Sequence, residues 1–229
     1  MKCPKCNATQ VSKNGHRKGR QCYKCKQCGR QFLDHYRSWQ YSNDVKQLCL
    51  KMYLNGMGLR GIERVTDIHH TTILHWVRAA GLSLPDAPES EEIPEIADLD
   101  ELQTFVGYKQ NKLWIWTAVN HFQAGILASV IGDRSAKTFQ PLWLTLKCFR
   151  CFFYVTDGWS VYPMFIEDGD HIVSKTYMTR IEGENTRLRH YLARLHRKTL
   201  CYSKSVEMLK CSLRLLLHYL KYRTVPLPA

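Results

Sequence analysis

The sequence predicts a multidomain protein in which a small metal-stabilised region and an all-α region precede a larger α/β domain. Two Cys-x-x-Cys pairs lie near the amino terminus, helical periodicity runs through residues 43–81, and strand-like apolar runs alternate with helices after residue 96. A chain of 229 residues is long enough to hold these parts. We expect the parts to span residues 1–41, 42–82, 83–96 and 97–229.

The charge balance predicts a polyanionic partner. The formal net charge is +13 and the isoelectric point is about 9.3, and nucleic acid is the commonest partner of such a chain, although a solvated basic surface is the alternative. The amino terminus has no apolar run typical of a signal peptide, and no stretch is long enough to span a membrane. We therefore expect a cytoplasmic protein whose ten cysteines are reduced, so that paired cysteines indicate metal.

The first part contains two pairs of cysteines with the spacing of a zinc ribbon. Cys3 and Cys6 form one pair, and Cys25 and Cys28 follow after eighteen residues. Four thiolates around one tetrahedral zinc would supply the folding free energy that so short and polar a segment cannot gain by burial. Cys22 is an alternative to Cys28 as a ligand, and Cys28 is preferred because Gly29 and Arg30 follow it as a turn.

Residues 43–81 have the pattern of a helix-turn-helix. Apolar periodicity predicts helices over 43–55, 59–65 and from about residue 70 to Gly81, with a break before the last. In that arrangement the last helix enters the major groove, while a plain three-helix module is the alternative. The polar residues that we expect to contact DNA are His70, Thr71, Thr72 and Arg78.

An acidic, proline-containing segment follows the helices. Three prolines and a run of Asp and Glu residues crowd residues 85–98. This composition indicates a linker over 83–96.

The remaining chain has an α/β order that brings two aspartates together. The strands are predicted near 98–107, 112–119, 124–131, 152–156 and 171–173, with helices at 136–147 and from about 181. Asp100 lies on the first strand and Asp157 ends the fourth, so these residues meet if the two strands are neighbours, as in ribonuclease H-like folds. Such carboxylates bind the two Mg²⁺ ions of phosphoryl transfer.

A third carboxylate, Glu182, begins the helix that follows. Glu182, Asn185 and Arg189 share one helix face at i, i+3 and i+7, and this face is expected to look into the site. Asn185 and Arg189 are expected to contact DNA, and Arg197 and Lys198 are expected to contact its phosphates. Asp98, Glu101 and Glu184 are competitors for the carboxylate positions, and each acid taken alone has an ordinary structural explanation.

A long apolar stripe predicts a final helix over residues 203–222. Its leucines recur at spacings of three and four residues. The stripe can pack onto the catalytic domain or pair two subunits.

At this point the motifs match a known family. The chain resembles the insertion-sequence-one family of prokaryotic transposases, which are of the DDE type, although Gln103 stands where the family often has Trp and Gly183 where a basic residue is usual. The matching motifs are Cys3-Pro-x-Cys6, Asn14-Gly15, Cys25-Lys-x-Cys28-Gly-Arg-x-Phe32, Leu99-Asp100-Glu101-Leu102, Thr156-Asp157-Gly-Trp159, Arg180-Ile-Glu182 with Asn185, and Arg197-Lys-Thr-x-x-Tyr-Ser-Lys-Ser205.

The resemblance implies an enzyme that acts on double-stranded DNA. Its catalytic triad falls on Asp100, Asp157 and Glu182, with two Mg²⁺ ions, or Mn²⁺, as cofactors and one structural zinc. It would bind terminal inverted repeats, cleave and transfer DNA strands into a target, associate with the nucleoid and act as a homo-oligomer. A non-catalytic DNA-binding regulator derived from such an element and a nuclease that does not rejoin strands are the alternatives.

Overall fold

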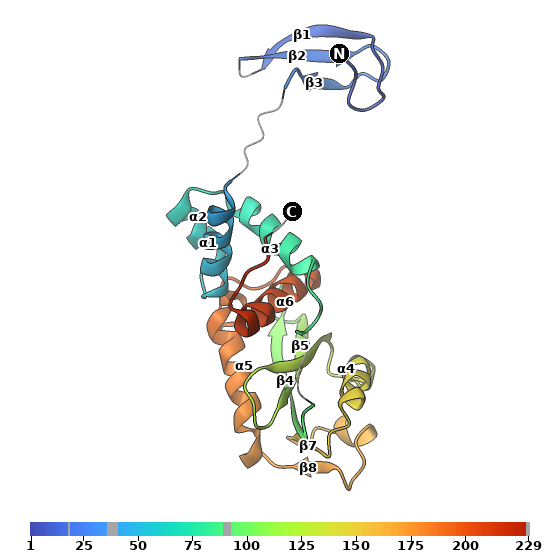
Figure 1. Cartoon of the computed structure of the whole chain (residues 1–229), viewed down its shortest axis with the longest axis vertical. Coiled ribbons are helices and arrows are strands. Elements are labelled where there is room, and N and C mark those ends of the chain that lie inside the picture. The colour runs from blue at the N-terminus through green and yellow to red at the C-terminus, as the bar shows by residue number, and fades with distance from the viewer. Residues whose placement is uncertain (18, 36–40, 89–92, 228–229) are drawn as a thin grey trace. The chain divides into compact units, whose positions relative to one another are not determined.

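The computed structural model describes residues 1–17, 19–35, 41–88 and 93–227. The chain divides into two compact units, Met1–Tyr41 and Ser42–Ala229 (Figure 1). Each unit is described by itself. Within the described residues, no helix combines the length and the apolarity that crossing a membrane requires.

The first unit is a small antiparallel sheet. Its strands β1 (Val11–Arg17), β2 (Arg20–Cys25) and β3 (Gln31–Leu33) lie in that order. The buried core consists of Cys3, Cys25 and Phe32, and Tyr23 stacks on Phe32 with ring centroids 6.0 Å apart. So small an apolar core gives little stability by burial alone.

The second unit begins with three helices at the predicted places. They are α1 (Asn43–Leu54), α2 (Leu59–Thr66) and α3 (His70–Leu82). Ser42 caps α1 by accepting a hydrogen bond from the Val45 backbone N–H, and Asp67 ends α2 in the left-handed conformation with φ of 56°. Ile62, Ile73 and Val77 are buried, so the apolar faces of α2 and α3 form a core.

The last helix, α6 (Val206–Tyr222), packs mainly against α3 and also contacts α1 and β6. A Cβ placed on Gly81 would lie 2.5 Å from the Cys211 carbonyl oxygen, so the two helices approach closely at this glycine. The Tyr53 hydroxyl and the Ser212 hydroxyl are 2.7 Å apart in the buried contact with α1. The apolar stripe was predicted either to pack onto the catalytic domain or to pair two subunits. Instead it packs mainly against α3, with a smaller contact to β6 of the sheet.

The start of α6 and the acidic segment differ from the sequence predictions in detail. The helix begins at Val206, three residues later than predicted, because Ser205 accepts a hydrogen bond from the Met208 N–H and so acts as the cap. In the acidic segment, Asp86 forms an ion pair of 2.7 Å with Arg214 on α6. Glu89, Glu91 and Glu92 lie outside the described residues.

A five-stranded mixed sheet forms the centre of the second unit. Strands β4 (Ile96–Phe105), β5 (Lys112–Asn120) and β6 (Ile126–Gly132) are antiparallel neighbours, while β7 (Phe153–Thr156) and β8 (His171–Val173) continue parallel from β4. The resulting order is β6-β5-β4-β7-β8. The predicted α/β class is therefore confirmed, although β4 begins two residues before its predicted start.

The helices α4 (Ala136–Phe149) and α5 (Thr179–Tyr191) cover opposite faces of this sheet (Figure 1). The α4 face holds an aromatic core in which Trp116, Phe139 and Tyr162 are fully buried. Leu99 of β4 points into that core, so Asp98 and Asp100, one residue to either side, point to the α5 face. The alternation of β4 thus places its carboxylates away from the apolar core.

Candidate functional site

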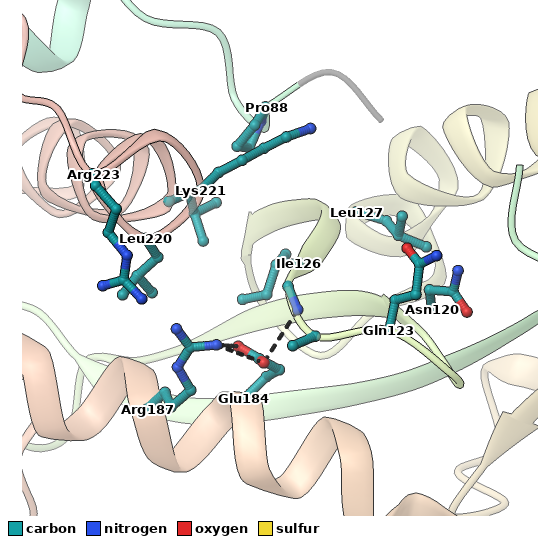
Figure 2. A pocket seen from close by; sticks show the side chains of 13 residues that line it. Pro88, Asn120, Gln123, Ile126, Leu127, Glu184, Arg187, Leu220, Lys221 and Arg223 are labelled. Atoms are coloured by element: carbon teal, nitrogen blue, oxygen red, sulfur yellow. Dashed lines mark hydrogen bonds and ion pairs between the residues drawn. The ribbon is translucent and has the colours of Figure 1, made fainter. Parts of the chain in front are cut away.

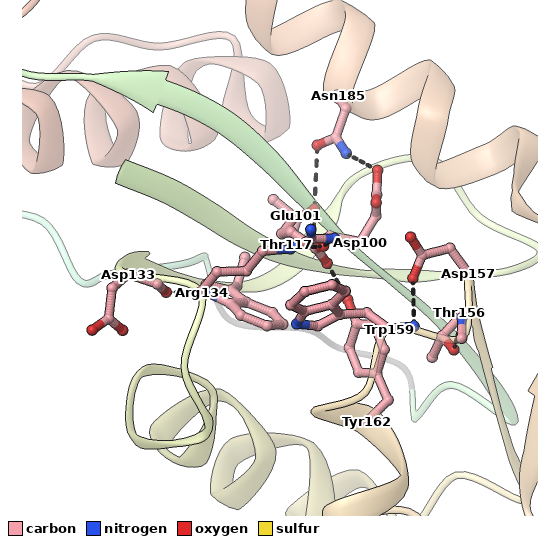
Figure 3. A network of polar contacts seen from close by, with 12 residues as sticks. Asp100, Glu101, Thr117, Asp133, Arg134, Thr156, Asp157, Trp159, Tyr162 and Asn185 are labelled. Atoms are coloured by element: carbon pink, nitrogen blue, oxygen red, sulfur yellow. Dashed lines mark hydrogen bonds and ion pairs between the residues drawn. The ribbon is translucent and has the colours of Figure 1, made fainter. Parts of the chain in front are cut away.

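The parallel pairing of β4 with β7 places Asp100 beside Asp157. Asp98 on β4 pairs with Val155 on β7. Because the strands are parallel, Asp100 and Asp157, each two residues further along, lie at the same level. Figure 3 shows the two carboxylates close together on the same side of the sheet. The strands that carry them are neighbours, as the sequence prediction requires.

Hydrogen bonds fix one oxygen of each aspartate. The Asn185 side-chain amide donates to Asp100 Oδ2 at 2.7 Å, and the Trp159 backbone N–H donates to Asp157 Oδ1 at 2.9 Å. Thr117, opposite Asp100 on β5, donates to Asn185 Oδ1 at 3.2 Å and so holds the amide in this orientation. The two aspartates are therefore held by groups from strand β5, helix α5 and the loop after β7.

Burial raises the pKa of Asp100. Hydrogen bonds from the Glu101 backbone and from Asn185 oppose this shift, and the negative charges of Asp157 and Glu182 add to it. The charges of Asp157 and Glu182 thus act on Asp100 in the same direction as its burial. A bound cation would relieve the repulsion between them.

Glu182 lies in the first turn of α5, one turn before Asn185, and is exposed. It therefore stands at the rim of the site, with the two aspartates deeper in the sheet. The oxygen atoms of these three carboxylates do not all lie within 4.8 Å of one another, so they do not form a compact site for a single ion. Among the described residues, the groups whose ligand atoms all lie within 4.8 Å of one another are the four cysteines Cys3, Cys6, Cys25 and Cys28 and the set Glu63, His69 and His70.

The structure gives each of the three competing acids a different contact. The Asp98 side chain is fully buried, with Oδ1 2.8 Å from His121 Nδ1. Glu101 points to the α4 face, where it accepts hydrogen bonds from Tyr162 at 2.7 Å and from Arg134. Glu184 is buried and accepts from the Gly125 N–H at 3.1 Å and from Arg187 at 2.8 Å.

These contacts separate the carboxylates that face the open site from those that hold the fold. Arg134 also lies over the Trp159 ring, 3.5 Å from its centroid, so it links Glu101 to Trp159 (Figure 3). Burial raises the pKa of Glu101, and the hydrogen bonds from Tyr162 and Arg134 oppose that shift. This polar network is structural.

The four predicted zinc ligands form one cluster in the first unit. The Cys3 and Cys28 sulfurs are 3.6 Å apart, as are those of Cys6 and Cys25. Zinc–sulfur bonds of about 2.3 Å in a tetrahedron separate the sulfurs by about 3.8 Å, so this cluster is compatible with zinc. Cys22 lies outside the cluster, with its thiol facing the Tyr23 carbonyl.

The polar residues of α3 take part in contacts within the chain. His70 Nδ1 is 2.8 Å from Glu63 Oε2, and Thr71 Oγ1 is 2.7 Å from His69 Nδ1. Thr72 is half-buried on the same turn. Arg78 pairs with Glu207 of α6 at 2.8 Å, and both side chains remain about half exposed, so this pair can open at little cost.

The predicted DNA-contact residues of α5 and the following loop divide into two groups. Asn185 is 6% exposed and is occupied by Asp100 and Thr117. Arg189 donates to the backbone carbonyls of Leu195 and Gln103, and burial lowers its pKa. Arg197 and Lys198 are exposed, and they remain accessible to phosphate.

Sequence reasoning missed His121, Arg134 and Tyr162. Each makes a side-chain contact with an acid on β4 from far away in the chain. One signal was present for His121, because it directly follows the buried strand β5, whose Asn120 pairs with Ala97. The identity of its partner depends on strand register, which the sequence pattern leaves open.

The chain is similar in sequence to proteins of insertion elements. Residues 95–224 match the model of a family described as IS1 transposase. The InsB protein of insertion element IS1 from Shigella flexneri is 38% identical over 112 residues, which is 49% of this chain and 86% of the relative. InsB proteins of IS1 elements from Escherichia coli (strain K12) and Haemophilus ducreyi are 36% identical over 140 residues, which is 61% of this chain and 83% of each relative.

The chain belongs to the IS1 transposase family. The matched region begins at the residue before β4 and continues past α6, so it includes the whole sheet, α5 and all three carboxylates. The cysteine cluster and the helices α1 to α3 lie outside the region that matches the family model. The resemblance stated from the motifs is thereby confirmed for this IS1-family chain.

We predict that Arg134→Ala lowers the free energy of unfolding by about 3–5 kcal/mol, because it leaves the buried Glu101 carboxylate without its cationic partner. The Glu101 side chain is 2% exposed, so water cannot replace the guanidinium. Urea unfolding followed by circular dichroism measures the change. Lys147→Ala, at an exposed position on α4, is the control and should change stability by less than about 0.5 kcal/mol; a similarly small effect of Arg134→Ala would contradict a structural network.

Proposed function

We propose that this chain is a DNA transposase in which Asp100, Asp157 and Glu182 hold two divalent cations, Mg²⁺ or Mn²⁺, for strand cleavage and strand transfer. The observation that supports this most is the β4–β7 register, which brings Asp100 level with Asp157. Glu182 lies at the rim, close enough for its charge to raise the pKa of Asp100. The strand order and the covering helices support a ribonuclease H-like catalytic domain.

The donor set fits hard cations. Carboxylate oxygens are the ligands that Mg²⁺ prefers, and bound Mg²⁺ would activate the attacking oxygen and stabilise the leaving oxygen of a phosphodiester. Two ions lie roughly 3.5 to 4 Å apart in such sites, so carboxylates spread along the pair suit them better than one tight cage. Asn185 would keep Asp100 oriented, because its amide donates to Oδ2 at 2.7 Å.

The parts before residue 95 supply DNA recognition in this proposal. The four cysteines would hold one structural zinc, and α2, the turn and α3 would act as a helix-turn-helix with His70, Thr71, Thr72 and Arg78 near the DNA. Arg197 and Lys198 would contact phosphates. Terminal inverted repeats and target DNA are the substrates, and the joining of two element ends implies a homo-oligomer that associates with the nucleoid.

We expect Asp157→Asn and Glu182→Gln each to reduce strand transfer in Mg²⁺ by more than about a hundredfold, because changes in outer-shell groups alone cost about 10- to 100-fold. The assay supplies a pre-cut element end and target DNA and scores the joined product. Glu167→Gln, an exposed carboxylate outside the site, is the matched control and should retain activity.

The same assay separates the alternatives. Hydrolysis without joined product by the wild-type chain would identify a nuclease, and DNA binding with neither reaction would identify a regulator. Unchanged joining by either variant would overturn the assignment of that residue.

We predict that the purified chain contains about one zinc ion and that Cys25→Ser removes it, since three thiolates leave the tetrahedral site incomplete. Cys22→Ser should retain the zinc, because Cys22 lies outside the cluster. Elemental analysis of both variants measures the difference. Equal zinc in Cys25→Ser and wild type, or loss of zinc in Cys22→Ser alone, would show that the ligand set is wrong.

A further inference from the structure

A second polar site adjoins the carboxylates on the α5 face of the sheet. It is a cavity of about 450 Å³ lined by His121, Arg180, Gly183 and Arg187, among others. Arg180 and Gly183 flank Glu182 on α5, and the partner of His121 is Asp98, two residues from Asp100 on β4. Two residues of a strand span about 7 Å, so along β4 the wall of the cavity lies about 7 Å from Asp100. Along α5 the cavity-lining residues directly adjoin Glu182.

A buried carboxylate holds His121 at the wall of this cavity. The Asp98 side chain is fully buried, and its Oδ1 is 2.8 Å from His121 Nδ1. The His121 side chain is 25% exposed, and it lines the cavity. Asp98 Oδ2 has no hydrogen-bond partner although it is buried. Burial raises the pKa of the Asp98 carboxyl, and the neighbouring His121 and Arg180 oppose that shift.

The cavity lining combines the basic side chains of His121, Arg180 and Arg187 with the carboxylate of Glu184. The positive charge of Arg187 is offset by Glu184, with which it forms a salt bridge of 2.8 Å. Arg180 is exposed and takes part in none of the salt bridges found in the described ranges. The first turn of α5 adds the partial positive charge of a helix amino terminus. His121 Nδ1 is 2.8 Å from Asp98 Oδ1, so Nε2 is the ring nitrogen left to meet an incoming oxyanion.

We propose that this cavity binds a phosphate group of the DNA strand that enters the carboxylate site, with His121 and Arg180 as donors and Asp98 as the residue that positions the imidazole. This proposal rests on the proposed transposase function. This phosphate is not the reacting phosphodiester but one next to it along the strand. The carboxylates proposed to bind metal are Asp100, Asp157 and Glu182, and the cavity lies beside them rather than between them.

The cavity continues into a second one of about 420 Å³, shown in Figure 2, which shares Ala124, Glu184 and Arg187 with the first. Lys221 and Arg223 line its far side. The two cavities share those three lining residues, and the basic side chains of Lys221 and Arg223 in the second cavity suit a phosphate backbone. This continuity favours a nucleic-acid strand over a small free anion.

The test measures binding separately from chemistry. The full-length, zinc-loaded chain is titrated in Ca²⁺ with a duplex oligonucleotide that ends at the 3′ end of the element, and single phosphates near that end are replaced in turn by neutral methylphosphonates. We expect one replacement to weaken wild-type binding by about tenfold to a hundredfold, the range for a hydrogen bond between charged groups. His121→Phe and Arg180→Gln should each weaken binding of the unmodified DNA by a similar factor. In these variants the methylphosphonate at that position should cause little further loss of affinity.

Two control variants distinguish loss of this site from a general loss of positive charge or of folding. Arg150→Gln removes an exposed arginine at the end of α4 and should bind as wild type, with the same sensitivity to the methylphosphonate. His121→Gln, which retains a donor, should recover part of the affinity. Arg180→Gln carries the test alone if His121→Phe unfolds, because Arg180 is on the surface.

The outcomes distinguish this site from the proposed function. Wild-type affinity in Arg180→Gln and His121→Phe, or variants that keep the full methylphosphonate effect, would overturn the phosphate site even if strand transfer is observed. Absence of Mg²⁺-dependent joining by wild type, with the methylphosphonate effect present and lost in the variants, would overturn the proposed reaction and leave the phosphate site standing.

Discussion

The parallel pairing of β4 with β7 is the constraint on which the rest of the second unit depends. The register pairs Asp98 with Val155 and so brings Asp100 level with Asp157. A shift of one residue in either strand would turn one aspartate into the aromatic core under α4, where a charged side chain is very costly. The buried apolar residues on the α4 face therefore enforce the position of the acids on the α5 face.

Acids on and near this sheet have two separate tasks. Glu101 and Glu184 are buried and paired with Arg134 and Arg187, and Asp98 is buried against His121. These paired carboxylates fix the sheet, the loop after β6 and the start of β4. Asp100 and Asp157 instead have one oxygen each held by an N–H donor, an arrangement that orients a ligand without neutralising its charge.

Much of this arrangement could be predicted from the sequence. The two cysteine pairs, the three helices and the alternation of β4 follow from local spacing, and the motif around Asp157 follows from a strand that ends in a glycine turn. The choice between Asp98 and Asp100 could not be made in this way, since both point to the same face. It depends on His121, which reaches Asp98 through the pairing of β4 with β5.

The packing of α3 against α6 was also beyond sequence reasoning. The stripe on α6 indicates an apolar face but not its partner, and the close approach at Gly81 depends on contacts between residues far apart in the chain. As a result, the helices before the acidic segment and the sheet after it form one compact unit, Ser42–Ala229. Residues placed near DNA on α3, such as Arg78, are thereby linked to α6 through Glu207.

The position of bound cations tests the central claim most directly. Crystals of the chain with element-end DNA and Mn²⁺ would locate the ions by anomalous scattering. The β4–β7 register predicts two peaks roughly 3.5 to 4 Å apart, with one ion contacting both Asp100 and Asp157 and Glu182 contacting one of the pair. Ions bound instead at Asp98, Glu101 or Glu184, with no ion shared by Asp100 and Asp157, would contradict the account.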